Sequence, residues 1–281
     1  MKTPYGWAVN IPWEANPTML WRTRQTLELL APDRWMDYWC EQPVQWPGYV
    51  PTIRSWHLDG VMPPQPVYDR LLANPSGETW LWLNEPNVQD KDDITPARGR
   101  DLALKFINVA RDLDVDMNWC GPNCSVNFPA QHAGGLSGQA WWREWLRLTR
   151  RAGIGGASSH GIHMYHSRSR AMVDDVWLAL TQDWRRQWVG DKPVVISEVC
   201  AENLPLTSQI EVMDACFKVY ETGLREGPAG RNGAMGVYWF AGYDYGLWPN
   251  CALCEVDPGK LQTMRLTPLG QHWKSLQARL R

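Results

Sequence analysis

Two glutamates follow short apolar stretches that lie far apart in the sequence. Glu85 comes after WLWL and Asn84, and Glu198 comes after VVIS, which is 198 − 85 = 113 positions later. Pro86 lacks a backbone donor and cannot continue a strand ladder, so it predicts that the first strand stops beside its carboxylate. Acidic side chains at the ends of two apolar runs indicate a chemical role.

Paired carboxylates at one rim are what the hydrolysis of a glycosidic bond requires. One is protonated and gives its proton to the leaving oxygen, and the other is ionised and attacks the anomeric carbon. At a separation of about 5–5.5 Å the attacking group is a nucleophile and the anomeric configuration is retained. Their surroundings must differ, and Asn84, His163 and Tyr165 can supply different hydrogen bonds. For either glutamate alone, the alternative is a solvated loop residue or a salt-bridge partner.

Eight short apolar runs are predicted strands. Near-continuous apolar runs are typical of parallel strands covered on both faces. The runs are Gly6–Asn10, Trp35–Trp39, Tyr49–Ile53, Trp80–Leu83, Val115–Trp119, Gly161–Met164, Val194–Ser197 and Met235–Trp239.

Helical spacing of apolar residues lies between these runs. Thr95 and Thr267 each precede a proline, which predicts an N-cap followed by proline at the first helical position. The predicted helices are Thr18–Leu30, Pro96–Leu113, Trp141–Arg151, Ala171–Trp188, Ser208–Thr222 and Pro268–Leu280.

The alternation of strands and helices predicts one α/β domain over residues 1–281, a (β/α)8 TIM barrel. Chemistry in that fold sits at the carboxyl ends of the strands. Strands four and seven would then bring Glu85 and Glu198 to one rim, with His163 and Tyr165 at the end of strand six. The segment Glu41–Gly48 is too short for a full crossover helix.

Composition excludes several classes of partner. The net charge of −2 gives no electrostatic footprint for nucleic acid or for an anionic membrane surface. No apolar run is long enough to span a bilayer, and the first residues lack the apolar core of a signal peptide. The protein is expected to be extracellular if a leader was removed and cytoplasmic otherwise, and a monomer is the simplest expectation.

Tryptophan is unusually frequent, with 19 Trp against 4 Phe. Indole suits the flat C–H faces of sugar rings, although it also fills protein cores. Two long segments, Gly121–Gln139 and Ala241–Thr267, are predicted to shape a substrate groove. The aromatic candidates for sugar contact are Tyr38, Trp39, Trp56, Trp119, Tyr243 and Trp248.

The seven cysteines leave three states open. Because the number is odd, at least one has no intramolecular partner. Cys120 and Cys124 with the pair Cys251 and Cys254 could form a four-thiolate zinc site, but the spacing is loose. Disulfides or free thiols are the alternatives, and we predict no metal in the functional site.

The stretches WLWLNEPN and PVVISEV resemble the acid/base and nucleophile strands of clan A retaining glycoside hydrolases. The resemblance implies a (β/α)8 barrel with Glu85 as acid/base and Glu198 as nucleophile. It implies that Asn84 hydrogen-bonds the sugar 2-hydroxyl. His163 and Tyr165 match the H-x-Y pair beside the carboxylates, and Trp239 matches the aromatic under the sugar at the cleaved bond.

A narrower resemblance is to glycoside hydrolase family 128, which consists mainly of β-1,3-glucanases. It covers nearly the whole chain. That family usually has Asp at the position of Asn87, and Thr-Glu-Phe or a similar triplet where this chain has Ser197-Glu198-Val199. The segments that carry the resemblance are WMDYWC, YVPTIRSW, LWLNEPN, HGIHMYH, KPVVISEV, GVYWFAG and TPLGQHW.

The sequence thus predicts a retaining endo-β-glycosidase, with an endo-β-1,3-glucanase as the first choice. A polysaccharide or oligosaccharide is the expected substrate, and no cofactor is needed. One alternative is a clan A glycosidase that acts on mannan, xylan or mixed-linkage glucan. Another is a non-catalytic carbohydrate-binding barrel.

Overall fold

The structure is a computed structural model of the whole chain. It describes residues 5–11, 17–37, 47–58, 65–73, 78–89, 91–125, 135–154, 159–165, 192–201, 204–227, 233–244, 246 and 249–281.

The chain forms two compact units, and two strands run through both of them. The first unit is Met1–Pro4, Tyr38–His163 and Lys192–Val195, and the second is Tyr5–Asp37, Met164–Asp191 and Ile196–Arg281. Strands β8 (His160–Tyr165) and β9 (Val194–Cys200) each begin in the first unit and end in the second.

The first unit is organised around parallel strands. β5 lies between β4 and β6 in one sheet, and β7 pairs with β8. Isolated parallel bridges, Asn84 to Asn123 and Cys120 to Ser159, continue the ladder from β5 and β6 toward the β7–β8 side. The remaining strand of this unit, β3, is short. The bounds are β3 Tyr49–Val50, β4 Thr52–Ile53, β5 Glu78–Trp82, β6 Met117–Cys120 and β7 Cys124–Ser125.

In the second unit the strands follow the order β2-β1-β10-β9-β8, and β1 pairs parallel with both of its neighbours. The segment after β10 adds an antiparallel hairpin, β11–β12. The bounds are β1 Gly6–Asn10, β2 Arg34–Met36, β10 Gly236–Phe240, β11 Cys254–Val256 and β12 Met264–Leu266.

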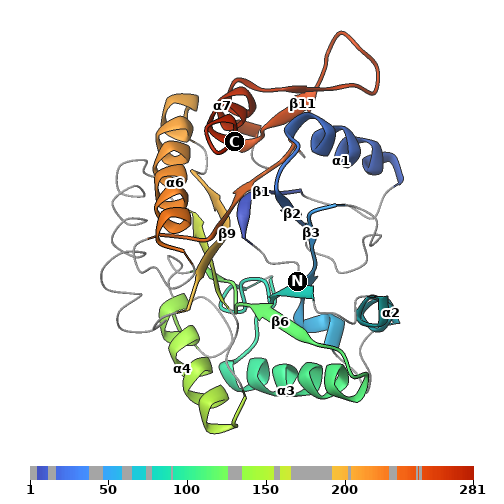
Figure 1. Cartoon of the computed structure of the whole chain (residues 1–281), viewed down its shortest axis with the longest axis vertical. Helices are drawn as coiled ribbons and strands as arrows, with labels where there is room; N and C mark the ends of the chain where they lie inside the picture. The colour runs from blue at the N-terminus through green and yellow to red at the C-terminus, as the bar shows by residue number, and fades with distance from the viewer. Residues whose placement is uncertain are drawn as a thin grey trace. The chain divides into compact units, whose positions relative to one another are not determined.

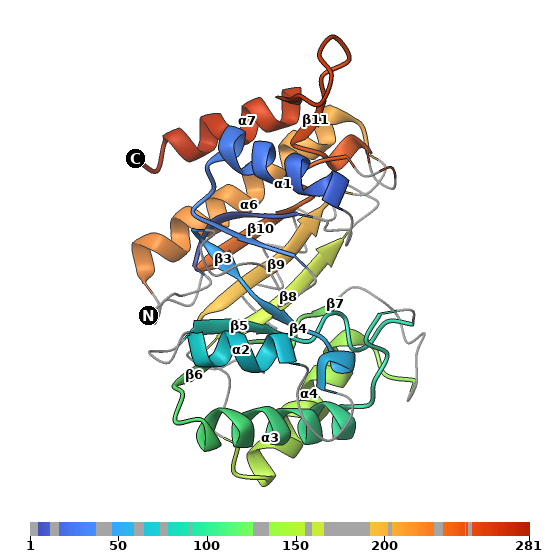
Figure 2. The same cartoon turned by 90° about the vertical axis from the view of Figure 1, so that its right-hand side faces the viewer.

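Helices cover the strands within each unit. In the second unit, α1, α6 and α7 lie on one side of β1, β10 and β9 (Figures 1 and 2). In the first unit, α3 and α4 pack together (Figure 1). The bounds are α1 Pro17–Leu30, α2 Gln65–Ala73, α3 Pro96–Asp112, α4 Gly138–Arg151, α6 Leu206–Glu226 and α7 Pro268–Ala278, with 3-10 turns at Ser55–Leu58 and Pro249–Cys251.

Tryptophan fills the core of both units. In the second unit Trp7 contacts Phe217 edge-to-face and stacks on Trp273, with ring centroids 5.1 and 5.9 Å away. In the first unit Trp82 stacks on Phe106 at 5.6 Å. Nine tryptophans have side chains less than 2% exposed, so packing accounts for a large share of the unusual tryptophan content.

Most of the predicted elements within the described residues are present. The predicted caps Thr95 and Thr267 accept hydrogen bonds from the helix backbone and precede proline, as expected. The sequence analysis missed α2, β7 and the β11–β12 hairpin, and it merged β3 with β4. The predicted helix Ala171–Trp188 lies outside the described residues.

Parallel strands with covering helices confirm the α/β class. Closure of eight strands into one barrel and the single-domain organisation stay predictions. None of the described helices combines the length and hydropathy that a bilayer-spanning helix needs.

The N-cap of α7 gives a test of this packing. Thr267 Oγ1 accepts from Gly270 N at 3.0 Å and donates to Ala252 O at 2.7 Å. We expect Thr267→Ala to lower the free energy of unfolding by about 1–2 kcal/mol, because a capped N–H and a carbonyl lose their partner. Thr267→Ser keeps the hydroxyl and should lose less. Urea unfolding followed by tryptophan fluorescence measures both, and equal losses would contradict the role of the hydroxyl.

Candidate active site

The turn that carries Glu85 has an unusual backbone. β5 ends at Trp82, and Leu83 and Glu85 then adopt φ of +60° and +48°. Residues with a Cβ rarely occupy this left-handed region, which costs on the order of 1–3 kcal/mol for each. The strained turn places the carboxylate at the carboxyl end of β5, as the Asn-Glu-Pro sequence predicts.

Buried amides hold this turn in place. Asn123 Nδ2 donates to the carbonyls of Trp82 and Leu83 at 3.2 and 2.9 Å, and Glu85 N donates to Asn123 O at 2.9 Å. A Cβ at Gly161 of β8 would lie 1.7 Å from Asn123 Oδ1, so the neighbouring strand must carry glycine there.

Asn87 joins the same turn to β7. Its Nδ2 donates to Ser125 O and its Oδ1 accepts from Ser125 N, both at 3.0 Å. A carboxylate at this position could accept but could not donate. The local structure therefore explains the departure from an acidic residue noted in the sequence.

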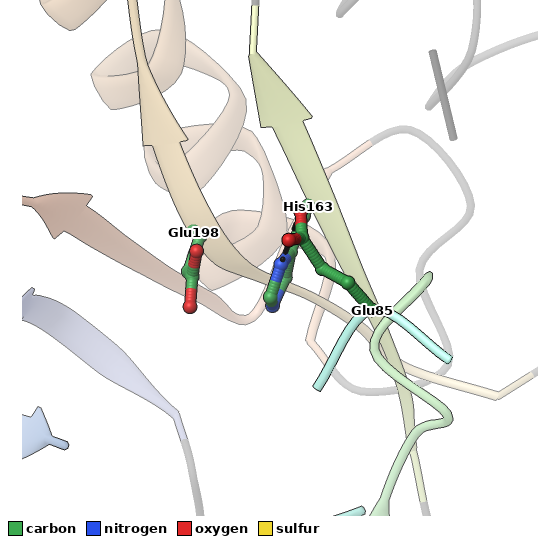
Figure 3. A group of neighbouring side chains, drawn as sticks. All are labelled: Glu85, His163 and Glu198. Atoms are coloured by element: carbon green, nitrogen blue, oxygen red, sulfur yellow. Dashed lines mark ion pairs between the residues drawn. The ribbon is translucent and has the colours of Figure 1, made fainter. Parts of the chain in front are cut away.

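Glu85 pairs with His163 of β8. Its Oε1 lies 3.2 Å from His163 Nδ1, and both side chains are buried (Figure 3). Burial raises the pKa of Glu85, but the hydrogen bond and charge of His163, together with Lys91 and Arg54, outweigh it, and the pKa lies below its ordinary value. In the free protein these surroundings therefore favour the ionised form of Glu85.

Glu198 lies in the second unit, within β9 and not at its end. The sequence analysis expected the strand to stop there, but β9 continues through Cys200. Tyr165 of β8 donates its hydroxyl to Glu198 Oε2, and Asn10 Nδ2 of β1 donates to Oε1 at 3.1 Å. These two donors fix the orientation of a carboxylate that is 2% exposed.

Side-chain alternation corrects the prediction for Trp239. β1 and β10 pair with Val9 opposite Trp239 and Asn10 opposite Phe240. Since Asn10 faces Glu198, Phe240 shares that face and Trp239 points to the other one. Trp239 is fully buried and donates Nε1 to Cys251 O at 2.8 Å.

Phe240 is therefore the aromatic at the end of β10 that lies on the same face as Asn10 and Glu198. Its ring meets Tyr165 edge-to-face at 6.0 Å. The sequence does not reveal this, because the face that each residue of β10 occupies depends on its pairing with β1.

The other predicted aromatic contacts have mixed outcomes. Trp119 is buried and packs edge-to-face on Trp82 and Trp145, so its position argues against sugar stacking. Tyr243 is also buried, beside its backbone bridge to Cys254. Trp56 is 41% exposed. The predictions for Tyr38, Trp39 and Trp248 lie outside the described residues.

The six cysteines that the structure describes are buried free thiols. Burial raises the pKa of Cys120 and Cys254 to about 12, against weaker lowering by hydrogen bonds to Ser159 and Thr26. No disulfide joins these described cysteines, so the disulfide alternative is wrong at these positions, while the zinc alternative stays a prediction. Cys40 lies outside the described residues.

One buried polar atom of the site has no partner in the described part of the chain. This is Asn84 Oδ1, whose residue is 2% exposed. A buried acceptor without a donor is costly, and a bound hydroxyl would satisfy it.

Comparisons with known proteins place the fold. No family model matches the sequence, and no curated protein matches it either. Solved structures do match: a GH128 (subgroup II) endo-β-1,3-glucanase from Pseudomonas viridiflava has 19% identity and a TM-score of 0.65, with 96% of this chain and 97% of that chain covered.

Two further GH128 structures cover similar shares. The subgroup I endo-β-1,3-glucanase from Amycolatopsis mediterranei, solved with laminaritriose, has 12% identity and a TM-score of 0.66 over 97% of this chain and 99% of that one. The subgroup VI exo-β-1,3-glucanase from Aureobasidium namibiae has 13% identity and a TM-score of 0.60 over 95% and 96%. The chain shares the fold of these enzymes over nearly its whole length.

Asn87 offers a test of the site's framework. We expect Asn87→Asp to lower the free energy of unfolding by about 1–3 kcal/mol at neutral pH, because a carboxylate would face Ser125 O without a proton to donate. The protonated carboxyl can donate, so its pKa is raised in the folded state. The loss should be small below the unfolded pKa of about 3.9 and should grow as the pH rises through the folded pKa.

Unfolding in urea between pH 3 and 8, with the wild type as reference at each pH, measures this difference. A loss that does not change with pH would contradict the bidentate role of the amide.

Proposed function

We propose that this protein is a glycoside hydrolase that cleaves β-1,3-glucan with retention of the anomeric configuration. Glu85 acts as the acid and then the base, and Glu198 acts as the nucleophile. The observation that carries the proposal is the pair of buried glutamates, each held by its own donor on β8.

The two glutamates contact side chains of the same strand, β8, which favours a common site for them. His163 and Tyr165 are alternate residues of β8, so their side chains leave the same face roughly 6.5 Å apart. His163 contacts Glu85, and Tyr165 contacts Glu198. We take this shared strand as support for two carboxylates that act on one glycosidic bond.

The surroundings of the two glutamates suit different roles. Glu85 lies 3.2 Å from His163 Nδ1, and a proton passed from this imidazole to Glu85 can then go to the leaving oxygen. Water is displaced when a sugar binds, which favours the neutral carboxyl. Glu198 receives hydrogen bonds from Asn10 and Tyr165, which support an ionised, oriented nucleophile.

The proposed reaction has two displacements. Glu198 forms an ester with the anomeric carbon while Glu85 protonates the departing oxygen. Glu85 then takes a proton from water, and the hydroxide oxygen replaces Glu198 on the same carbon. The unpartnered Oδ1 of Asn84 is placed to accept from a sugar hydroxyl next to the cleaved bond.

The order of the strands supports a closed barrel around this site. The first unit runs from β4 through β5 and β6 to β8 by ladders and bridges, and the second unit runs from β8 through β9, β10 and β1 to β2. We take this succession as support for eight consecutive barrel strands, with Glu85 after the end of β5 and Glu198 within β9, near its end.

The choice of β-1,3-glucan rests on the solved neighbours. These neighbours are endo- and exo-β-1,3-glucanases, and one is bound to laminaritriose. We favour endo action, as in the first of them. Release of reducing sugar from laminarin, compared with mannan, xylan and mixed-linkage glucan, tests the substrate. Binding of laminari-oligosaccharides without cleavage would instead favour a non-catalytic carbohydrate-binding protein.

Substitution of each glutamate tests the two roles. Glu198→Gln should lower kcat at least about 10³-fold, because it removes the nucleophile. Glu85→Gln should lower kcat on laminarin about 10²–10⁴-fold, but less on an aryl glycoside whose leaving group needs no proton. Glu28→Gln, on the exposed face of α1, is the matched control.

Proton NMR of the first product reads the anomeric configuration. Inversion, or a Glu198→Gln enzyme with wild-type turnover, would contradict the mechanism.

The hydrogen bond from Tyr165 gives a separate prediction. Tyr165→Phe removes a donor from Glu198 and should lower kcat about 10- to 100-fold, in line with a charge-assisted hydrogen bond. Tyr68→Phe, on α2, is a control for loss of a phenolic hydroxyl away from the site. Steady-state kinetics on laminarin measure both, and unchanged kcat in Tyr165→Phe would show that Asn10 alone suffices.

A further inference from the structure

A buried ion pair lies directly behind the turn that carries Glu85. Arg54 Nε donates to Asp92 Oδ1 at 2.8 Å, and the Asp92 side chain is fully buried. Both residues belong to the first unit, and neither was singled out in the sequence. The pair is not a surface salt bridge, so removal of one partner leaves a buried charge uncompensated.

Asp92 uses both carboxylate oxygens to tie two segments together. Oδ2 accepts from Asn84 N at 2.7 Å, one residue before Glu85. Oδ1 accepts from the backbone N and the hydroxyl of Ser55, both at 3.1 Å. Asp92 N in turn donates to Asn84 O at 3.3 Å. The Asp92 carboxylate thus accepts four hydrogen bonds, one of them from the left-handed turn at residues 83–85, and this bond anchors the turn.

Arg54 is itself fixed on its other side. Its backbone N donates to His57 Nδ1 at 2.9 Å, and burial, with the charge of Arg54, lowers the pKa of His57 to about 3. His57 is therefore a neutral acceptor at working pH. The backbone of Arg54 is thus held beside the Ser55–Leu58 turn, while its Nε contacts Asp92.

The charged groups around Glu85 come from several elements. His163 of β8 pairs with it, and Arg54 and Lys91 act on it from two loops. Burial, and after it the charge of Glu85, raises the pKa of Cys124 on β7. In the proposed catalytic pair, the carboxylate of Glu198 is a further charge that faces Glu85. Asp92 is the carboxylate that neutralises Arg54 within this group.

We propose that Asp92 is a positioning residue for Glu85. It holds the left-handed turn that aims the Glu85 carboxylate, and its pairing with Arg54 sets how much positive charge Glu85 senses. The inference rests on the proposed function for its consequence in catalysis, but the structural claim stands on Asp92, Arg54 and Asn84 themselves.

Two variants of the ion pair should move the proton affinity of Glu85 in opposite directions. Asp92→Asn leaves the Arg54 charge unbalanced, which stabilises the Glu85 carboxylate and lowers its pKa. Arg54→Met removes the positive charge and raises that pKa. A carboxyl carbon-13 NMR titration, with the Glu85 resonance assigned by its loss in Glu85→Gln, measures both shifts without any substrate.

Kinetics give the second readout. In Asp92→Asn we expect kcat on laminarin to fall about 10- to 100-fold with KM changed less than about threefold, because a slightly misaimed acid lowers the rate more than it weakens binding. The alkaline limb of the kcat/KM profile should move to lower pH in Asp92→Asn and to higher pH in Arg54→Met. Asp112→Asn, exposed at the end of α3, is the charge-matched control and should match the wild type.

The two claims fail in distinguishable ways. A wild-type protein that hydrolyses no glucan ends the proposed function, while the NMR titration still decides the role of Asp92. A Glu85 pKa that is unchanged in both variants, or that shifts in the same direction in both, overturns the inference.

Loss of folding is controlled separately. If near-ultraviolet circular dichroism shows that Asp92→Asn does not fold, Ser55→Ala removes only one hydroxyl donor from Asp92. It should then show a smaller fall in kcat, and a wild-type kcat would overturn the positioning role.

Discussion

Side-chain alternation along β8 is the constraint on which the candidate site depends. His163 and Tyr165 leave the same face of one strand, and each contacts a different buried glutamate. A shift of register by one residue would turn both side chains toward the helices. Gly161 leaves the space between the strands that Asn123 occupies. One strand therefore sets the partner of each carboxylate and the spacing between the partners.

The turn at Glu85 shows how strain is maintained where it is useful. Two residues with left-handed backbone are unfavourable by themselves. Buried Asn123 binds the carbonyl of Leu83 and the amide of Glu85, and buried Asp92 binds the amide of Asn84 between them, so the strained form keeps all of these hydrogen bonds. The unfavourable backbone conformation of the turn is thus offset by its hydrogen bonds to the buried side chains of Asn123 and Asp92.

The sequence predicted where strands and helices lie better than it predicted which face of a strand each side chain occupies. Apolar runs and Thr-Pro caps locate strands and helices because they act over a few residues, and Asn84-Glu85-Pro86 marks a strand end for the same reason. The strand parity of Trp239 and Phe240 depends on pairing with β1, which is more than two hundred positions away in sequence. Asp92 had no signal of its own, because its partners Arg54 and Ser55 come from a different strand end.

The aromatic residues of the core and the aromatic residue near Glu198 differ in their polar atoms. Trp7, Trp82, Trp145 and Trp273 bury an Nε1 for which the described residues provide no hydrogen-bond partner. Each such group costs about 1–3 kcal/mol, which the large area of a buried indole can offset in a core. The face shared with Glu198 instead carries Phe240, whose ring has no donor to satisfy. Because the ring of Phe240 has no N–H or O–H, it cannot donate to Glu198, and Asn10 and Tyr165 are the donors that the carboxylate receives there.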